Sequence, residues 1–202
     1  MRCCRPVDVK LGVLALQGNV SEHIDAFRQA LEHRGYGTTS LVKEIRKPAD
    51  LEDCDALAIP GGESTTISRL IDKNGLYESI RTFSGGIFAT CAGMVLVATN
   101  VPDPRVHSLG LIGMTIDRNA FGRQKESFET DICVEGLGKR PFHAIFIRAP
   151  LVSCVDPGVR VLARVDQGIV AVGKDKHLAL SFHPELGCDL RLHDRFLKNL
   201  GI

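Results

Sequence analysis

The stretch Phe88-Ala-Thr-Cys-Ala-Gly93 carries the strongest information about the fold of this chain. An apolar run from Gly86 to Ala89 leads into Cys91, and a helix-like run from Met94 to Ala98 follows it. This order predicts a strand, a sharp turn and a helix, an arrangement that lifts a nucleophile out of a sheet. Unpaired N–H groups at a helix N-terminus favour a thiolate over a thiol. Because its neighbours are small enough for a tight turn, we interpret Cys91 as a nucleophile and not as a core cysteine.

Strand and helix signals alternate along the first half of the chain. The run Leu11–Leu16 is continuously apolar, which is typical of a strand covered on both faces. We expect a helix that Ser21 caps and Gly35 ends, strands at Thr38–Val42 and Asp55–Pro60, and helices at Ser64–Lys73 and Tyr77–Phe83. This alternation predicts an α/β fold with a doubly wound, mostly parallel sheet and helices on both faces.

The pattern changes after Leu109, where short segments of alternating polarity follow one another. They lie at Glu129–Glu135, Phe142–Ile147, Val159–Val165, Gly168–Val172 and Leu178–Phe182, before a terminal helix at Leu190–Leu200. These segments predict a more antiparallel region that joins the same sheet, which is therefore mixed. No repeat or linker interrupts the chain. We expect a single three-layer domain at 10–202, of the flavodoxin-like kind, after an N-terminal extension at 1–9.

Composition excludes several classes of function. The formal net charge is +1 and aromatic residues make up 5% with no Trp, which argues against nucleic acid or an anionic membrane as partner. The apolar segments are shorter than the ~20 residues of a membrane span, and Leu11–Leu16 is too short for a signal-peptide core. A cytoplasmic location is the expectation.

The seven cysteines show no metal-ligand or disulfide spacing. There is no C-x-x-C pair and no accompanying pair of histidines at ligand spacing, and the number of cysteines is odd. We therefore expect no metal and no cofactor, and interpret the cysteines other than Cys91 as small buried hydrophobic residues or idle thiols.

A second motif, His183-Pro-Glu185, follows the apolar run Leu178–Phe182. This places His183 at the carboxyl end of a buried strand, where open α/β sheets hold their sites. In extended chain, residues i and i+2 project to the same side, so Glu185 can hold one ring nitrogen while the other takes a proton from sulfur. Alone, the motif also fits a capping histidine beside a solvated glutamate. Together with Cys91 it predicts a catalytic triad.

The segment Pro60-Gly-Gly-Glu-Ser-Thr65 lies between a predicted strand and a predicted helix. Its glycines allow close approach to a ligand, and N–H groups at that helix terminus can bind an oxyanion. A plain turn is the alternative, and the missing G-K-[ST] ending argues against a nucleotide-binding loop. Arginines at 118–123 and Arg148 are less specific, although the α-carboxylate of an amino acid would favour a nearby cation.

Taken together, these residues resemble the class I (triad) glutamine amidotransferases, and within them the glutaminase subunits of two-component pyridoxal 5′-phosphate synthase. The resemblance covers nearly the whole chain. It rests on Gly12-Val-Leu-Ala-Leu-Gln-Gly18, Glu22-His23, Pro60-Gly-Gly-Glu-Ser-Thr65, Thr90-Cys-Ala-Gly93, Arg118-Asn-Ala-Phe-Gly-Arg-Gln124, Phe146-Ile-Arg-Ala-Pro150 and His183-Pro-Glu-Leu186. The Leu-Gln-Gly, Gly-Gly-Glu-Ser-Thr and Arg-Asn-Ala-Phe-Gly motifs are the specific ones.

The resemblance implies roles for these residues. Cys91 attacks the side-chain amide of L-glutamine to form a γ-glutamyl thioester, and His183, oriented by Glu185, moves protons. Positions in contact with substrate or oxyanion are Gly61, Gly62, Glu63, Arg118, Ile147 and Arg148. Ammonia then passes to a barrel-shaped synthase subunit in a large hetero-oligomer, which builds pyridoxal 5′-phosphate from a pentose phosphate and a triose phosphate. The Gln17 region matches a segment that this partner organises.

Two departures from the family pattern stand out. Ala89 replaces the glycine usual in the turn, which is tolerable if residue 89 has negative φ. The first eight residues, with Cys3 and Cys4, have no counterpart. Two alternatives remain: an enzyme of the same fold that serves a different synthase or hydrolyses other γ-glutamyl compounds, and a non-catalytic regulatory subunit.

Overall fold

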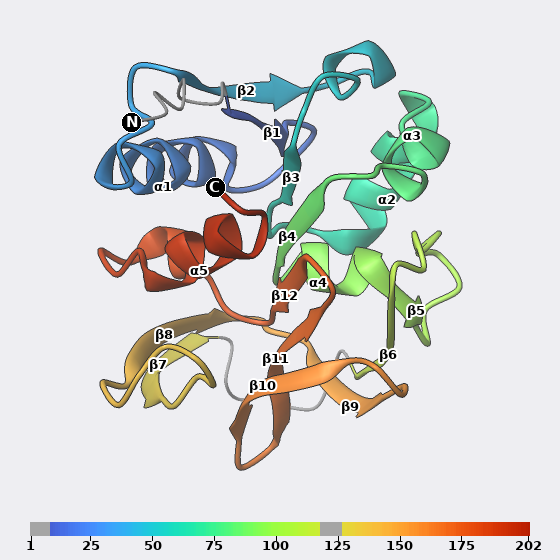
Figure 1. Cartoon of the computed structure of the whole chain (residues 1–202). Coiled ribbons are helices and arrows are strands. Elements are labelled where there is room, and N and C mark those ends of the chain that lie inside the picture. Colours follow the sequence, from blue (N-terminus) through green and yellow to red (C-terminus); the bar gives the residue numbers. More distant parts are fainter. Residues whose placement is uncertain (1–8, 118–126) are drawn as a thin grey trace.

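The fold is a three-layer α/β domain, shown in Figure 1. The computed structural model describes residues 9–117 and 127–202. The strands are β1 (Val9–Leu14), β2 (Ser40–Ile45), β3 (Ala56–Ile59), β4 (Gly86–Thr90), β5 (Ala98–Asn100), β6 (Ile112–Asp117), β7 (Ser127–Ile132), β8 (Phe142–Ile147), β9 (Leu151–Val155), β10 (Arg160–Val165), β11 (Gly168–Lys174) and β12 (His177–Leu180). The α-helices are α1 (Val20–His33), α2 (Ser64–Lys73), α3 (Tyr77–Arg81), α4 (Ala92–Val97) and α5 (Arg191–Asn199), with 3-10 turns at Pro48–Asp50 and Pro184–Leu186.

The main sheet is parallel in one half and mixed in the other. Its strands follow the order β2-β1-β3-β4-β12-β11-β9-β6-β5, with β10 paired to β11. The neighbours from β2 to β12 are parallel, and the register pairs Ile59 with Ala89 and Leu180 with Thr90. Beyond β12 the pairs β12–β11, β11–β9 and β9–β6 are antiparallel, whereas β6 and β5 are parallel. The carboxyl ends of β1, β3, β4 and β12 therefore meet along one edge, which we call the carboxyl edge.

Helices cover both faces of the parallel strands (Figure 1). One apolar cluster joins α1 and α5 to alternate strand residues such as Leu11 and Ala58. The other joins α2, α3 and α4 to the intervening residues, such as Leu57 and Ile59. Strand residues alternate between the two clusters because successive side chains of a strand point to opposite faces. This explains why the central strands are apolar throughout.

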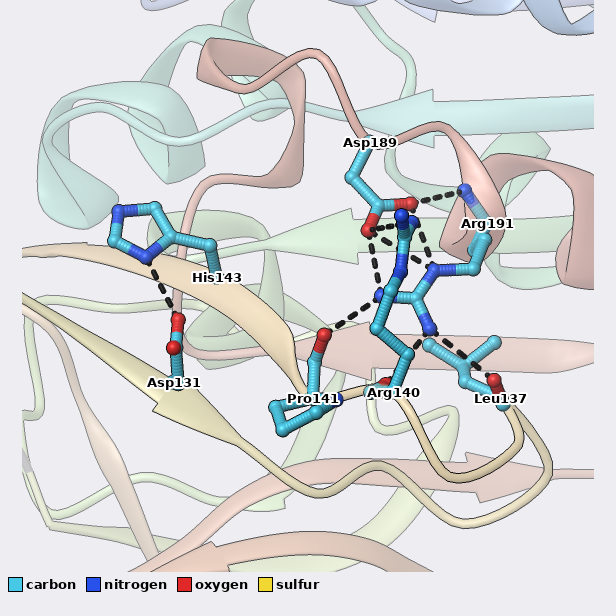
Figure 2. Close-up of polar contacts among 7 residues, drawn as sticks. All are labelled: Asp131, Leu137, Arg140, Pro141, His143, Asp189 and Arg191. Carbon is cyan, nitrogen blue, oxygen red and sulfur yellow. Dashed lines mark hydrogen bonds and ion pairs between the residues drawn. The ribbon is translucent and has the colours of Figure 1, made fainter.

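A separate hairpin of β7 and β8 packs beside the first cluster and is fastened to the start of α5. Arg191 donates hydrogen bonds to the carbonyl oxygens of Leu137, Arg140 and Pro141, all in the β7–β8 connection (Figure 2). Asp189 accepts from Arg191 at 2.6 Å and from Arg140 at 3.0 Å. These bonds hold the hairpin, at the start of β8, against the part of the chain that follows β12.

The structure confirms the predicted fold class and departs from the prediction in local detail. Ser21 does not cap the first helix: α1 begins at Val20 after Asn19, and the Ser21 hydroxyl donates to Glu22 instead. Ala98 belongs to β5 and not to the preceding helix, and β5, β6 and β9 were not predicted. The division into an extension at 1–9 and a domain at 10–202 stays a prediction, although Val9 already pairs in β1.

Within the part of the chain that the structure describes, none of the helices combines the length and the apolar character needed to cross a membrane.

A buried histidine of α5 packs in the core against the sheet. The ring of His193 is fully buried, stacks on Phe88 at 5.0 Å between centroids and meets Phe27 edge-on at 4.9 Å. Neither ring nitrogen has a hydrogen-bond partner among the residues that the structure describes. Burial, helped by His23, lowers the pKa of His193 from 6.5 to about 3, against the opposing effects of Glu185 and Asp189. The folded chain therefore keeps this ring neutral.

We expect His193→Phe to stabilise the chain in mild acid. Below pH 6.5 the unfolded chain protonates His193 and the folded chain does not, so stability is lost as pH falls from 6.5 toward 3. Between pH 7.5 and pH 5 this loss is about 2 kcal/mol for one such group. Urea unfolding at both pH values measures it. His193→Phe should lose correspondingly less stability than wild type, whereas His33→Gln, at an exposed position of α1, should lose as much; equal losses in all three would contradict the expectation.

Candidate active site

The predicted site residues gather at the carboxyl edge of the sheet. Gln17 and Asn19 follow β1, Gly61 follows β3, Cys91 follows β4 and His183 follows β12. These strands are neighbours in the sheet, so segments far apart in sequence meet at one place. This is the edge where open α/β sheets bind ligands.

Cys91 occupies a strained turn between β4 and α4. Its φ of 48° and ψ of −106° lie in a region that L-residues rarely adopt, as expected for a nucleophile on a sharp strand-to-helix turn. Its N–H donates to the carbonyl oxygen of Leu180 at 2.8 Å, which fixes the turn to β12. The Sγ atom lies 3.6 Å from the carbonyl oxygen of Ile147. The turn predicted from the sequence is therefore confirmed.

The turn accommodates two residues that the sequence singled out. Ala89 is fully buried in β4 and is not among the residues with positive φ, so its methyl group adds no backbone strain. Gly93 lies where a Cβ atom would stand 2.1 Å from the carbonyl oxygen of Ile59. Only glycine allows α4 to approach β3 this closely.

His183 and Glu185 form a buried pair beside Cys91. Nδ1 of the His183 ring lies 2.7 Å from Oε1 of Glu185. The backbone N–H of His183 donates to the carbonyl oxygen of Ile145 at 2.9 Å. Burial alone would lower the pKa of His183, but the hydrogen bonds with Cys91 and Glu185 raise it to about 10. Burial would raise the pKa of Glu185, but His23 and His183 lower it to about 2. At neutral pH the pair is an imidazolium that donates Nδ1–H to a carboxylate.

Gly61 fits between the catalytic side chains. A Cβ atom at this position would lie 2.3 Å from Cε1 of His183 and 3.2 Å from Cβ of Cys91. Gly62 is similarly close to the amide of Gln17, with a Cβ position 2.4 Å from its Oε1 atom. The two glycines thus bring the backbone into contact with the site, as expected from the sequence.

At the start of α2 the structure differs from the expectation that the N–H groups are available to bind an oxyanion. The carboxylate of Glu63 caps its own helix by accepting from the N–H groups of Thr65, at 3.2 Å, and Thr66, at 2.7 Å. Burial would raise the pKa of Glu63, but these bonds and the hydroxyl of Thr65 lower it to about 2. The Glu63 N–H donates to Oε1 of Gln17 at 2.8 Å. These N–H groups are therefore engaged within the chain and not free for an oxyanion, because an acidic side chain stands at the N-cap.

Two of the remaining predicted contacts, Ile147 and Arg148, lie at the end of β8. The Ile147 carbonyl oxygen faces Cys91, and the next residue, Arg148, is exposed and has a φ of 44°. Arg118 lies outside the described residues. The structure thus places Ile147 and Gly61 beside Cys91, and Arg148 follows Ile147 in the chain. Gly62 and Glu63 are exposed in the connection between β3 and α2, residues 60–63, which we call the glycine loop.

Three polar residues at the site had no role assigned from the sequence. Asn19 donates from Nδ2 to Oε1 of Glu185 at 3.2 Å, and Nε2 of His23 lies 3.5 Å from Oε2 of the same carboxylate. The hydroxyl of Thr90 lies 3.0 Å from Nε2 of His23 and accepts from the Gly61 N–H at 3.1 Å. No local sequence signal marks these contacts, because they join the start of α1, β4, the loop after β3 and the turn after β12, which are far apart in sequence.

The chemistry of the site is that of a nucleophilic cysteine with a histidine–carboxylate pair. A sulfur nucleophile, a proton donor on the adjacent ring and a carboxylate that fixes the ring suffice for acyl transfer through a thioester. Among residues 9–117 and 127–202, no three His, Cys, Asp or Glu side chains gather in a way that could hold a metal ion.

Comparisons with known proteins agree with this chemistry. Residues 13–201 match the model of the SNO glutamine amidotransferase family. The chain is 71% identical over 194 residues to a protein of Methanoregula boonei named pyridoxal 5′-phosphate synthase subunit PdxT, covering 96% of this chain and all of that protein. A protein of the same name from Methanosphaerula palustris is 63% identical, with 97% of this chain and 100% of the relative covered.

Solved structures point the same way. A crystal structure described as a glutamine amidotransferase superposes with a TM-score of 0.83 at 44% identity, covering 95% of this chain and 99% of the other. The glutaminase domain of CTPS from Trypanosoma brucei, at 13% identity and a TM-score of 0.55 over 96% of this chain and 94% of that one, shares the fold. With a family match over nearly its whole length and relatives at 71% and 63% identity, this chain belongs to the SNO glutamine amidotransferase family.

Proposed function

We propose that this chain hydrolyses L-glutamine to L-glutamate and ammonia through a thioester on Cys91, and supplies the ammonia to a synthase subunit that makes pyridoxal 5′-phosphate. The observation that carries the chemistry is the placement of Cys91 on a strained turn beside the 2.7 Å His183–Glu185 pair. The names of the relatives, which are subunits of pyridoxal 5′-phosphate synthase, support the destination of the ammonia.

In the first half-reaction the Cys91 thiolate attacks the side-chain carbonyl carbon of glutamine. The C–S bond forms and the carbonyl oxygen becomes an oxyanion. His183, protonated at neutral pH, then gives a proton to the amide nitrogen from the ring nitrogen that does not face Glu185. The C–N bond breaks and ammonia leaves, so that a γ-glutamyl thioester and a neutral His183 remain.

In the second half-reaction water hydrolyses the thioester. Neutral His183 takes a proton from the attacking water while Glu185 keeps the ring oriented through Nδ1. The C–S bond breaks, glutamate leaves, and the thiolate–imidazolium pair is restored. Each turnover thus consumes one glutamine and one water, and His183 regains from water the proton that it gave to the amide nitrogen.

For the substrate contacts we keep the assignment made from the family resemblance. Gly61, Gly62 and Glu63 line the acyl and oxyanion region, and Arg118, Ile147 and Arg148 contact glutamine. The approach of Gly61 to both catalytic side chains and of the Ile147 carbonyl oxygen to Cys91 supports two of these positions.

The state of the glycine loop supports a dependence on the partner. The N–H groups of Glu63, Thr65 and Thr66 are bonded within the chain, to Gln17 or to the Glu63 side chain, while Gln17 and Gly18 are exposed. We propose that a barrel-shaped synthase subunit docks on the Gln17 region in a large hetero-oligomer and organises the oxyanion site there. A cytoplasmic location likewise stays a prediction.

Glutamate release from glutamine tests the proposal, first with this chain alone and then with the synthase subunit from the same genome. We expect weak release by the chain alone, and an increase of about 10²-fold or more with the synthase, because one oxyanion donor typically contributes 10²–10³ in rate. Cys91→Ala should remove the activity in both cases.

Two outcomes would contradict the proposal. Equal rates with and without the synthase would remove the role assigned to docking. No release in either case, with a folded chain, would favour a regulatory subunit or a different synthase.

A further inference from the structure

The catalytic carboxylate of Glu185 is held from two sides. Its Oε1 atom contacts Nδ1 of His183 at 2.7 Å and Nδ2 of Asn19 at 3.2 Å. Its Oε2 atom lies 3.5 Å from Nε2 of His23, an electrostatic contact, and has no hydrogen-bond partner among the described residues. The side chains of His23 and Glu185 are fully buried. Since water does not reach Oε2, His23 is the group that determines its environment.

The surroundings of His23 select one tautomer of its ring. With the proton on Nδ1, a buried donor would lack an acceptor and the Nε2 lone pair would point at the carboxylate. With the proton on Nε2, the N–H donates to Oγ1 of Thr90, 3.0 Å away, and lies beside Oε2 of Glu185, so that of the two ring nitrogens only the Nδ1 acceptor lacks a partner among the described residues. Because an unpaired buried donor is costly and the carboxylate repels a lone pair, the Nε2–H tautomer is favoured.

The charge on this ring follows from the same surroundings. Burial lowers the pKa of His23, and His183 lowers it further, against the opposing effects of Glu185 and Glu22. His23 is therefore neutral beside the ionised Glu185. It acts on the carboxylate through an N–H group and not through a full charge, so it does not compete with His183 as the ion-pair partner.

The same ring also connects the carboxylate with the glycine loop. Oγ1 of Thr90 accepts from the Gly61 N–H at 3.1 Å, and Gly61 lies against both His183 and Cys91. A continuous set of contacts thus runs from Glu185 through His23 and Thr90 to Gly61. The groups contributed by Glu185, His23 and Thr90 are buried side chains, whereas Gly61 contributes its backbone N–H.

We propose that His23 is a positioning residue of the triad: its Nε2–H, bonded to the hydroxyl of Thr90, attracts Oε2 of Glu185 electrostatically across 3.5 Å, so that Oε1 stays on Nδ1 of His183. The inference rests on the proposed roles of Cys91, His183 and Glu185. It assigns to the start of α1 a part in catalysis, since Asn19 immediately before the helix and His23 in its first turns contact different oxygens of one carboxylate.

The reactivity of Cys91 in the isolated chain tests this without glutamine or a partner. The rate of alkylation by iodoacetamide, followed by mass spectrometry of the Cys91 peptide, is measured against pH. A carboxylate that is held less firmly stabilises the imidazolium less, so the midpoint of the profile in His23→Phe should move up by about one pH unit. His193→Phe, which removes a fully buried histidine whose ring has no hydrogen-bond partner in the described part of the chain, should keep the wild-type midpoint.

Two polar variants keep the test decisive if His23→Phe does not fold. The amide nitrogen of His23→Gln reaches about as far as Nε2, whereas that of His23→Asn reaches only about as far as Nδ1. His23→Gln should therefore restore most of the wild-type midpoint and His23→Asn should not. Equal midpoints in the two variants, or a wild-type midpoint in His23→Phe, would overturn the proposal.

Turnover with the synthase separates positioning from a general effect on the fold. In His23→Phe we expect kcat to fall about tenfold or more, with a smaller change in KM, because the N–H group that attracts the ionised carboxylate is lost. In a Glu185→Gln background the same substitution should cost little more, whereas a merely structural effect would multiply with it.

The two failures can be told apart. If wild type releases no glutamate with any synthase, the proposed function fails, and the alkylation profiles still decide the role of His23. If wild type turns over and the two substitutions multiply fully, the proposed function stands and the positioning role is wrong.

Discussion

Cys91→Ser is expected to abolish glutamine hydrolysis, with kcat lowered by about 10⁴-fold or more. Serine is close to cysteine in size, and it enters the same strained turn with a φ of 48° and the same N–H bond to Leu180, so the site should keep its shape. A serine hydroxyl, however, stays protonated beside His183 and attacks an amide poorly. Steady-state glutamate release in the presence of the synthase measures the loss.

Two comparisons make this expectation specific. Cys154→Ser, at an exposed cysteine of β9, should retain wild-type turnover. Unfolding of Cys91→Ser in urea should match wild type closely, which separates loss of the nucleophile from loss of the fold. Turnover of Cys91→Ser within tenfold of wild type would rule out a thioester on this residue.

Gly61→Ala should produce the next largest effect, a fall in kcat of about 10²-fold or more. The new methyl group would stand 2.3 Å from Cε1 and 3.1 Å from Nδ1 of His183, far inside van der Waals contact. His183 cannot retreat without losing its 2.7 Å contact with Glu185. A displacement of about 1 Å at a reacting group can cost about 10² in rate. Single-turnover formation of the thioester would measure the loss at the step it affects.

Gly187→Ala is the matched control for this substitution. It lies two residues after Glu185, with a negative φ of −103° and no heavy atom closer than 3.9 Å to the position of an added Cβ. We expect it to keep wild-type turnover and stability. A fall in kcat of similar size in both variants would show that alanine is harmful at either position, and the effect could then not be attributed to the contact of residue 61 with His183.

The layered α/β arrangement was predictable because its signals are local. Apolar runs such as Leu11–Leu16 mark buried strands, and the step from Gly86 to Cys91 marks the turn. The strands β5, β6 and β9 were not predictable in this way. Their pairings contain register shifts, and Ala98 continues the apolar run of α4, so no residue marks where the helix ends.

The proximity of Cys91, His183 and Glu185 could likewise be predicted, whereas the residues around them could not. The triad residues lie in two short motifs, and the resemblance to a family joined them. Asn19 looks like an ordinary residue before a helix, and its amide is turned from capping α1 toward Glu185. At the start of α2 the N–H groups of Thr65 and Thr66 were expected to be available to a ligand, but they donate to the carboxylate of Glu63. Residue spacing does not reveal that a side chain of the helix N-cap competes with a ligand for these groups.

Because β4 and β12 are neighbours in the sheet but far apart in the sequence, the site that they carry forms late in folding. These strands pair in parallel although the whole antiparallel half of the sheet lies between them in sequence. Closing so long a loop is entropically costly, and contacts of this kind slow folding. During synthesis the chain carries Cys91 long before His183 and Glu185 exist. A nascent or truncated chain therefore has the sulfur without its proton donor, and ammonia release waits until the sheet is complete.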